Sequence, residues 1–162
     1  MIIGIVAVEK NHGIGFQGQM PWPKLEHDLA WFKEKTTDHI VLMGSKTWKS
    51  IGKFLNNRIN VVISSNLYPE ATLTFSDPIS AIDELKERFQ NKDIFIIGGQ
   101  QLYNSVKDLV EQWYITEINT AYVCDTFFDL NFVKEHYKEV TEINHFEISK
   151  DTPSYSIKEY KK

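Results

Sequence analysis

The sequence predicts a three-layer α/β domain in which helices cover both faces of a largely parallel β-sheet. Three short apolar runs rich in β-branched residues, at 2–8, 39–43 and 93–97, are typical of central strands buried on both faces. Helical segments alternate with these runs, and this order indicates parallel strands joined by crossover helices. After residue 110 strand-like segments predominate, which predicts an antiparallel hairpin at the C-terminal edge of the sheet.

Local signals place the remaining elements. We expect further strands at 59–64, 113–119, 137–146 and 154–160. We expect helices at 25–36, 45–51, 78–90 and 100–110. Asp77 as a cap and Pro78 at the first helical position mark the start of the third helix. No linker, repeat or low-complexity segment divides the chain, so we expect one domain over residues 1–162.

Composition excludes several classes of function. The chain has 162 residues, of which 42% are hydrophobic, so it has ample apolar content for one packed core. A net charge of -4 gives no basis for binding nucleic acid, and the apolar opening ends at Glu9, too early for a signal core or a membrane span. Cys124 is the only cysteine, which rules out an intrachain disulfide and suits a reducing cytoplasm, where we expect the protein.

The most informative single residue is Asp28, a carboxylate on the apolar side of a predicted helix. Helical spacing places Leu25, Leu29 and Phe32 on one stripe, and Asp28 falls on that stripe. An acid facing an apolar surface loses hydration, which raises its pKa unless a cation or donor is supplied, and such a group is a candidate proton donor or ligand anchor. Acids in the first turn of a helix also complement exposed backbone N–H groups. The residues alone leave both interpretations open.

A glycine-rich segment at 13–18 fits the pattern G-x-G-x-x-G without predicting a dinucleotide fingerprint. That fingerprint opens a helix, whereas here prolines stand where the first turns of the helix would run. We expect instead a long mobile loop at 9–24 that closes over a ligand, with Met20, Trp22 and Ile14 as its apolar underside. The alternative is a structural Ω-loop, which is disfavoured because exposed Met and Trp side chains need something to cover.

Glycine also marks two predicted junctions between a strand and a helix. The segment at 44–47 resembles the end of a P-loop, but its spacing does not fit one. Its N–H groups, Lys46 and Thr47 are able to hold one phosphate, although this segment alone favours a plain helix start capped by Ser45. The glycine pair at 98–99 ends another strand, and a tight turn is the alternative there. Two such junctions on neighbouring strands suit the two ends of an extended phosphate-rich cofactor.

Other polar residues give weaker signals. Arg58 opens a predicted strand, where its planar guanidinium suits a two-pronged contact with a ligand carboxylate. The five histidines show no ligand spacing, and no Ser-His-Asp order is supported. We therefore expect neither a metal site nor covalent catalysis.

An ordered set of short segments runs along nearly the whole chain. They are Ile14-Gly15, Met20-Pro21-Trp22, Asp28-Leu29-Ala30-Trp31-Phe32, Met43-Gly44, Thr47-Trp48, Ser50-Ile51-Gly52, Arg58, Ser64-Ser65, Ile97-Gly98-Gly99, Tyr103, Asp125-Thr126 and Phe128. In this order and spacing they resemble the dihydrofolate reductase family of the bacterial chromosomal type. The resemblance implies an eight-stranded, mostly parallel sheet with an antiparallel C-terminal hairpin and four main helices. It also implies that NADPH reduces 7,8-dihydrofolate to 5,6,7,8-tetrahydrofolate, with hydride transfer to C6 and protonation at N5, in a monomer that supports one-carbon metabolism and thymidylate synthesis.

The resemblance assigns substrate roles residue by residue. Asp28 binds the pterin 2-amino group and N3, and Thr116 hydrogen-bonds Asp28. Trp22 and the Met20 loop cover the site and order water, while Arg58 takes the α-carboxylate of the glutamate tail. The residues implied to line the apolar cleft are Ile5, Val6, Ala7, Leu29, Phe32, Ile51, Leu55, Ile97 and Tyr103.

Cofactor roles are implied in the same way. The residues are Ala7, Ile14 and Gly15 at the nicotinamide; Gly44, Ser45, Lys46 and Thr47 at the pyrophosphate and 2'-phosphate; Ser64, Ser65 and Asn66 at the adenosine; and Gly98, Gly99, Gln100, Gln101 and Leu102 at the pyrophosphate. Ile97 and Thr126 are also implied to bind the cofactor. In the family the bond between the two glycines is cis. Ser45 stands where arginine is common and Gln101 replaces a frequent basic residue, so the preference for NADPH over NADH depends on Lys46, the serines and helix-terminal N–H groups. Cys124 stands where glycine is usual, which bears on how the covering loop is held.

Two alternatives remain at the level of the sequence. A related pyrimidine or pterin reductase on the same fold would be distinguished by substrate competition and by Arg58→Leu. A non-catalytic nucleotide-binding or folate-binding module would bind ligand without turnover, although such a module needs no buried acid beside a gate.

Overall fold

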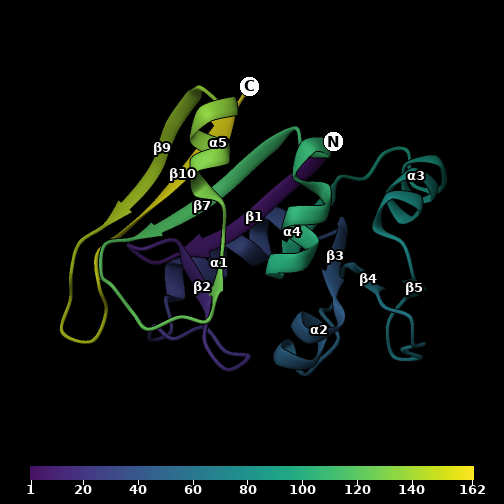
Figure 1. Ribbon diagram of the computed structural model, residues 1–162, viewed down its shortest axis with the longest axis horizontal. Helices are drawn as coiled ribbons and strands as arrows, with labels where there is room; N and C mark the ends of the chain where they lie inside the picture. The colour runs from purple at the N-terminus through teal and green to yellow at the C-terminus, as the bar shows by residue number, and fades with distance from the viewer.

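An eight-stranded sheet forms the centre of the protein, and a computed structural model describes it over residues 1–162 (Figure 1). The strands are β1 (Ile2–Val8), β2 (Gly13–Gly15), β3 (Ile40–Gly44), β4 (Ile59–Ile63), β5 (Leu73–Phe75), β6 (Ile94–Gly98), β7 (Gln112–Ile118), β8 (Thr126–Phe127), β9 (Glu139–Phe146) and β10 (Tyr155–Lys161). The large sheet has the order β5-β4-β3-β6-β1-β7-β10-β9, and β2 pairs with β8 in a separate ribbon. All pairs from β5 to β7 are parallel, whereas β10 is antiparallel to β7 and β9.

Helices cover both faces of the sheet. They are α1 (Glu26–Thr36), α2 (Ser45–Ile51), α3 (Pro78–Arg88), α4 (Gln100–Val106), the short 3-10 helix η1 (Lys107–Leu109) and α5 (Leu130–His136). Side chains of α3, α4 and α5 pack with one face in a cluster of 21 buried residues. Side chains of α1 and α2 pack on the other face, against a cluster of seven. Figure 1 shows α4 and α5 in front of the sheet and α1 behind it.

The main predictions for the sheet are confirmed. The three apolar runs form β1, β3 and β6, which lie side by side in the middle of the sheet. Burial on both faces explains why their sequences are continuously apolar rather than alternating. The C-terminal hairpin is also present, with β9 at the edge. Asp77 accepts a hydrogen bond from the Ser80 N–H at 2.8 Å, so the predicted cap of α3 is present.

The sequence signals missed several short elements. β2, β5 and β8 have only two or three residues each, too few to show a period. The fifth helix, α5, was also missed because it spans only seven residues, although its cap is clear, since Asp129 accepts from the Phe132 N–H at 3.1 Å. The fourth predicted helix ends early as α4 and continues as η1. None of the helices combines the length and apolar character that crossing a bilayer requires.

Candidate functional site

Asp28 and Thr116 meet between α1 and β7. The Thr116 hydroxyl donates to Asp28 Oδ1 at 2.5 Å, as predicted, and Thr116 is buried while Asp28 is half-buried. Burial raises the pKa of the Asp28 carboxyl above its ordinary value, and the hydrogen bond from Thr116 opposes part of this rise. Because one hydroxyl cannot satisfy both carboxylate oxygens, Asp28 retains acceptor capacity for a ligand.

The predicted apolar stripe around Asp28 is only partly packed. Leu25 is buried, but Leu29 remains 40% exposed and Phe32 is half-buried. Thr36 is the one buried residue inside α1. Leu29 is therefore accessible beside Asp28 and is not packed into the core. An exposed leucine beside a half-buried acid forms an apolar surface with a polar anchor, the combination that small-molecule sites use.

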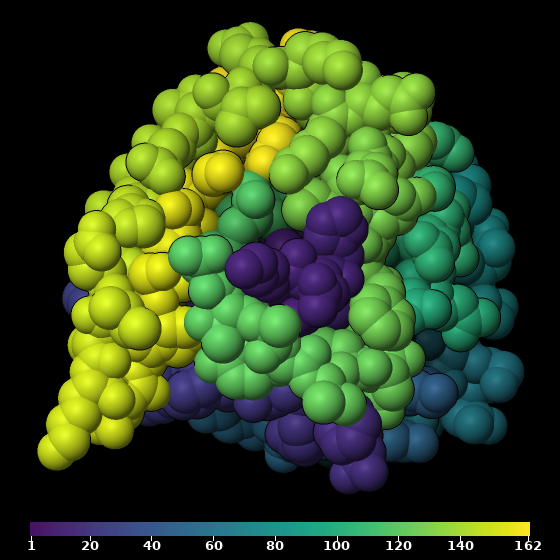
Figure 2. Space-filling view, turned by 60° about the vertical axis from the view of Figure 1, so that its left-hand side comes forward, coloured from purple at the N-terminus to yellow at the C-terminus, as the bar shows by residue number.

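The loop at 9–24, which we call the lid, is more structured than expected. Its β2 strand pairs with β8, and the Gln17 N–H donates to Asp125 Oδ2 at 2.9 Å. In Figure 2 the N-terminal residues, in purple, are surrounded by green segments from later in the chain. Met20 is 57% exposed, as expected for a covering residue.

Trp22 does not lie exposed under the lid, contrary to prediction. It is buried with Leu25, Ile118 and Tyr155, and its ring meets the edge of Tyr122 at a centroid distance of 6.3 Å. Packing into this cluster removes the large apolar surface of the ring from water, whereas an exposed position under the lid would leave that surface hydrated until a ligand binds. Trp22 therefore anchors the C-terminal end of the lid, and Ile14 packs against the core in its first half.

The two glycine junctions lie beside each other, as the sequence predicted. β3 and β6 are parallel neighbours with Met43 opposite Gly98, so α2 and α4 start from the same edge of the sheet. The Gly98-Gly99 peptide bond is cis. A Cβ on either glycine would lie 3.4 Å from Thr47 Oγ1, and Gly98 has a φ of +126° that side chains disfavour. The φ value therefore accounts for glycine at Gly98, whereas at Gly99 the Thr47 hydroxyl leaves little more than contact distance for a side chain.

The cap of α2 differs from the expected one. Gly44 is the cap residue and Ser45 is the first helical residue, with no side-chain capping hydrogen bond. Gly44 provides the extended backbone of a cap without a side chain. The Ser45 hydroxyl consequently remains outside the capping role that the sequence suggested.

The predicted adenosine residues lie at the same edge of the sheet. β4 is parallel to β3, and its end at Ile63 leads directly to Ser64, Ser65 and Asn66. The Asn66 N–H donates to the Ser64 hydroxyl at 3.1 Å, and Ser65 is exposed. Lys46 is also exposed. The predicted cofactor residues of β3, β4 and β6 therefore share the carboxyl edge of the sheet, where open α/β sheets bind ligands.

Arg58 is held in place at the far end of α1. Its Nε donates to the Asn56 carbonyl at 2.9 Å, and one terminal nitrogen donates to the Thr36 hydroxyl at 3.2 Å. Its guanidinium carbon lies 6.0 Å from the centre of the Phe32 ring. Partial burial lowers the pKa of Arg58 from its usual high value. The remaining guanidinium donors are oriented but not used within the protein.

The apolar residues predicted for the cleft divide between the two faces of the sheet. Ile5 packs on the face of α1 and α2, together with Leu55 and the half-buried Ile51 and Ile97. Val6 packs in the opposite cluster, because neighbouring side chains of a strand point to opposite faces. The Val6 side chain therefore does not lie with Asp28, and only its backbone is available on that side.

Tyr103 also packs in that opposite cluster, and its hydroxyl donates to the Ile5 carbonyl at 2.7 Å. Complete burial strongly raises the pKa of the Tyr103 hydroxyl, so this donor keeps its proton. Tyr103 thereby fixes β1 against α4.

Comparison with known proteins supports the family resemblance found in the sequence. A profile described as dihydrofolate reductase matches residues 1–162. The chain is 35% identical over 149 residues to dihydrofolate reductase of Haemophilus influenzae, covering 88% of this chain and 91% of that protein. The chain belongs to the dihydrofolate reductase family. It is also 38% identical over 125 residues to dihydrofolate reductase of Staphylococcus aureus, covering 76% of this chain and 75% of the other.

A third relative is dihydrofolate reductase type 9 of Escherichia coli, at 34% identity over 146 residues, which cover 86% of this chain and 81% of that protein. As a dihydrofolate reductase, the protein reduces dihydrofolate to tetrahydrofolate with a nicotinamide cofactor.

Sequence reasoning missed two side chains that support the site of this reductase. Glu9 is 1% exposed, and its carboxylate accepts from the N–H groups of Asn11, Gly13 and Tyr122 at 2.7 to 3.0 Å, which fixes the start of the lid. Tyr155 lies near Asp28, and burial followed by the Asp28 charge raises the pKa of its phenol. The acid at the end of an apolar strand was a signal for Glu9, whereas Tyr155 carried none.

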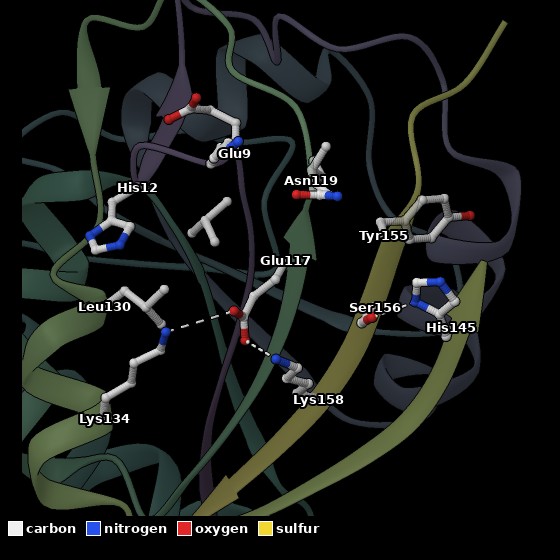
Figure 3. A pocket seen from close by; sticks show the side chains of 13 residues that line it. Glu9, His12, Glu117, Asn119, Leu130, Lys134, His145, Tyr155, Ser156 and Lys158 are labelled. Atoms are coloured by element: carbon white, nitrogen blue, oxygen red, sulfur yellow. Dashed lines mark hydrogen bonds and ion pairs between the residues drawn. The ribbon is translucent and has the colours of Figure 1, made fainter. Parts of the chain in front are cut away.

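A separate polar cavity of about 350 Å³ lies at the ends of β1, β7 and β10 (Figure 3). Glu117 points into it and forms ion pairs with Lys134 at 3.9 Å and Lys158 at 3.4 Å. Because Glu117 follows Thr116 in β7, their side chains point to opposite faces of the sheet. The cavity therefore lies on the face of α5, and Asp28 does not line it.

Proposed function

We propose that Asp28 anchors the pterin ring of dihydrofolate and that NADPH is the nicotinamide cofactor. The observation that carries the proposal is the half-buried carboxylate of Asp28. One of its oxygens accepts a hydrogen bond from the Thr116 hydroxyl at 2.5 Å, and the carboxylate lies beside the exposed apolar side chain of Leu29. A carboxylate that has lost hydration gains from donors supplied by a ligand, and the 2-amino group and N3 of a pterin are such donors.

Asp28 acts in two ways in this proposal. Its oxygen accepts hydrogen bonds that orient the flat ring, and its negative charge favours the protonated ring in a site of reduced polarity. Thr116 positions the carboxylate by fixing one oxygen. Leu29 and Phe32 offer apolar surface to the ring, and Arg58 offers its free donors to the carboxylate of the glutamate tail.

The residues at the carboxyl edge of the sheet fit a dinucleotide. Gly44, Gly98 and Gly99 lack side chains at the adjacent junctions, so a diphosphate is able to approach the backbone there. When bound, the cofactor supplies a hydride from its nicotinamide C4 to the pterin C6. The lid, with exposed Met20 at its tip, excludes water from the region between Asp28 and these junctions.

Preference for NADPH requires recognition of its 2'-phosphate. The exposed cation in the first turn of α2 is Lys46, and Ser64 and Ser65 supply hydroxyls at the end of β4. Since Ser45 and Gln101 carry no charge, Lys46 is the main electrostatic determinant. Lys46→Met should therefore raise the KM for NADPH by roughly tenfold while leaving the KM for NADH nearly unchanged, the effect of losing one charge-assisted contact.

The proposal is tested by initial rates with dihydrofolate, which are measured from the decrease in NADPH absorbance. We expect turnover by the wild type, at least a tenfold loss of kcat/KM in Asp28→Asn near neutral pH, and wild-type rates in Glu34→Gln, which removes an exposed acid from the same helix. Full activity of Asp28→Asn would overturn the role of Asp28. Equal effects of Lys46→Met on both nicotinamides would overturn the assignment of the 2'-phosphate to Lys46.

A further inference from the structure

Gln100 makes a contact that its expected place at the pyrophosphate does not explain. It is the first residue of α4, directly after the glycine pair, and its Oε1 accepts a hydrogen bond from the Phe127 N–H at 2.7 Å. Phe127 belongs to β8, so this side chain joins the cofactor junction to the strand that pairs with the lid. The two residues are 27 positions apart in the sequence.

Residues 125–128, which we call the latch, hold the lid along their other side. The Asp125 N–H donates to the Gly15 carbonyl at 2.9 Å, and its carboxylate accepts from the Gln17 N–H at the same distance. The Phe128 N–H donates to the His12 carbonyl at 2.8 Å. On one side the latch therefore contacts the lid, through backbone groups and the Asp125 carboxylate, and on its other side it contacts Gln100 of α4.

The Gln100 contact replaces a missing strand. The ribbon of β2 and β8 has only two strands, so an outward N–H of β8 has no neighbouring strand to bond. The amide oxygen of Gln100 satisfies the N–H of Phe127 instead. Nearby, the Phe128 ring packs edge-on to Tyr103 of α4 at a centroid distance of 5.3 Å, which fixes the base of the latch. Phe127 itself is 48% exposed, so its side chain adds little packing to the restraints that β2 and Gln100 place on its backbone.

We propose that Gln100 is a positioning residue that ties the latch, and through it the lid, to the cofactor junction. This inference rests on the proposed placement of the cofactor at residues 98–102. A ligand that orders this junction then also orders the lid, because the Gln100 side chain connects the α4 backbone directly to the latch, and the latch is hydrogen-bonded to the lid. By linkage, an ordered lid raises the affinity of the junction for the cofactor by the same factor.

Amide hydrogen exchange in the ligand-free protein tests the tether without any dependence on activity. Gln100→Met keeps the length of the side chain but removes the acceptor, so exchange of the Phe127 N–H should accelerate roughly three- to tenfold. Gln100→Glu keeps an acceptor oxygen and should retain near wild-type protection. Gln101→Met removes the neighbouring exposed glutamine and should leave Phe127 unchanged. Unchanged Phe127 exchange in Gln100→Met would overturn the tether.

The coupling is tested by adding saturating NADPH and following the Gln17 N–H, which lies on the lid. We expect the cofactor to slow this exchange in the wild type and to slow it at least threefold less in Gln100→Met. Equal slowing in both proteins would overturn the coupling, as would no slowing in the wild type. Turnover with NADPH, measured on the same samples, separates the second outcome from failure of the proposed cofactor.

Discussion

At the residue scale, the proposed pterin anchor is a carboxylate whose two oxygens have different surroundings. Thr116 donates to one Asp28 oxygen, and the other is left for a ligand. Burial raises the pKa of Asp28 and the Thr116 hydroxyl lowers it, so the hydroxyl keeps the acid ionised to lower pH than burial alone would allow. The charge of the proposed pterin anchor is therefore adjusted by a neighbouring neutral residue.

Thr116→Val tests this balance. Removing the hydroxyl takes away the contribution that lowers the pKa, so the pKa of Asp28 should rise further. Because the ionised form binds the pterin, the acid limb of the pH profile of kcat/KM should move to higher pH, with a loss of roughly tenfold at neutral pH. Thr116→Ser keeps the hydroxyl and should restore the wild-type profile. An unmoved acid limb in Thr116→Val would show that another group controls it.

Individual residues differ in how far the sequence could predict them. Asp28 was identifiable because helical spacing exposes a mismatch between an acid and its apolar neighbours, and Thr116 followed from the family resemblance. Trp22 was misplaced because its burial depends on Tyr155 and Ile118, which come much later in the chain. Val6 was assigned to the cleft although strand alternation turns its side chain away. The contact of Gln100 with Phe127 carried no sequence signal at all.

At the scale of elements, the β2 and β8 ribbon determines where the lid lies. The backbones approach so closely that a Cβ on Gly13 would lie 2.3 Å from Cys124 Sγ, and one on Gly15 would lie 2.7 Å from Thr126 Oγ1. Glycine at both positions is thus required by packing rather than by flexibility. The glycines that suggested a nucleotide loop serve this pairing instead.

Gly13→Ala should therefore destabilise the protein by about 1–3 kcal/mol, because the added methyl overlaps the Cys124 side chain in a packed site. Combining it with Cys124→Gly removes the overlapping atoms and should recover most of the loss. The free energy of unfolding from urea titrations of both single variants and the double variant measures the coupling. Additive effects in the double variant would argue against this contact as the cause.

Long elements were predictable and short ones were not. Runs of five to seven apolar residues and the Asp77-Pro78 helix start provide enough pattern to define β1, β3, β6 and α3. β2, β5 and β8 exist because tertiary contacts select them, and their two or three residues hold no period.

At the scale of the whole molecule, one sheet carries both the proposed folate anchor and the proposed cofactor edge. Asp28 meets β7, the cofactor junctions follow β3 and β6, and β1 lies between them. The three hydrophobic clusters are built on this continuous sheet, so loss of one exposes the others. The fold therefore sets the distance between the two ligand sites.

A single sheet predicts a single unfolding transition. The four tryptophans report on all three clusters, since Trp113, Trp22 and the pair Trp31 and Trp48 belong to different ones. Urea denaturation followed by tryptophan fluorescence and by far-UV circular dichroism should give coincident curves. Separated midpoints would indicate two units and contradict the expectation of one domain.

The most direct test of the central claim is the affinity for dihydrofolate of the wild type and Asp28→Asn at neutral pH, measured by quenching of tryptophan fluorescence. Loss of a charge-assisted hydrogen bond is worth about 1.5–3 kcal/mol, so the Kd should rise roughly 10- to 150-fold in Asp28→Asn. Glu34→Gln should bind like the wild type, and NADPH affinity should be similar in all three proteins. Equal dihydrofolate affinity in the wild type and Asp28→Asn would contradict the role of Asp28 as the pterin anchor.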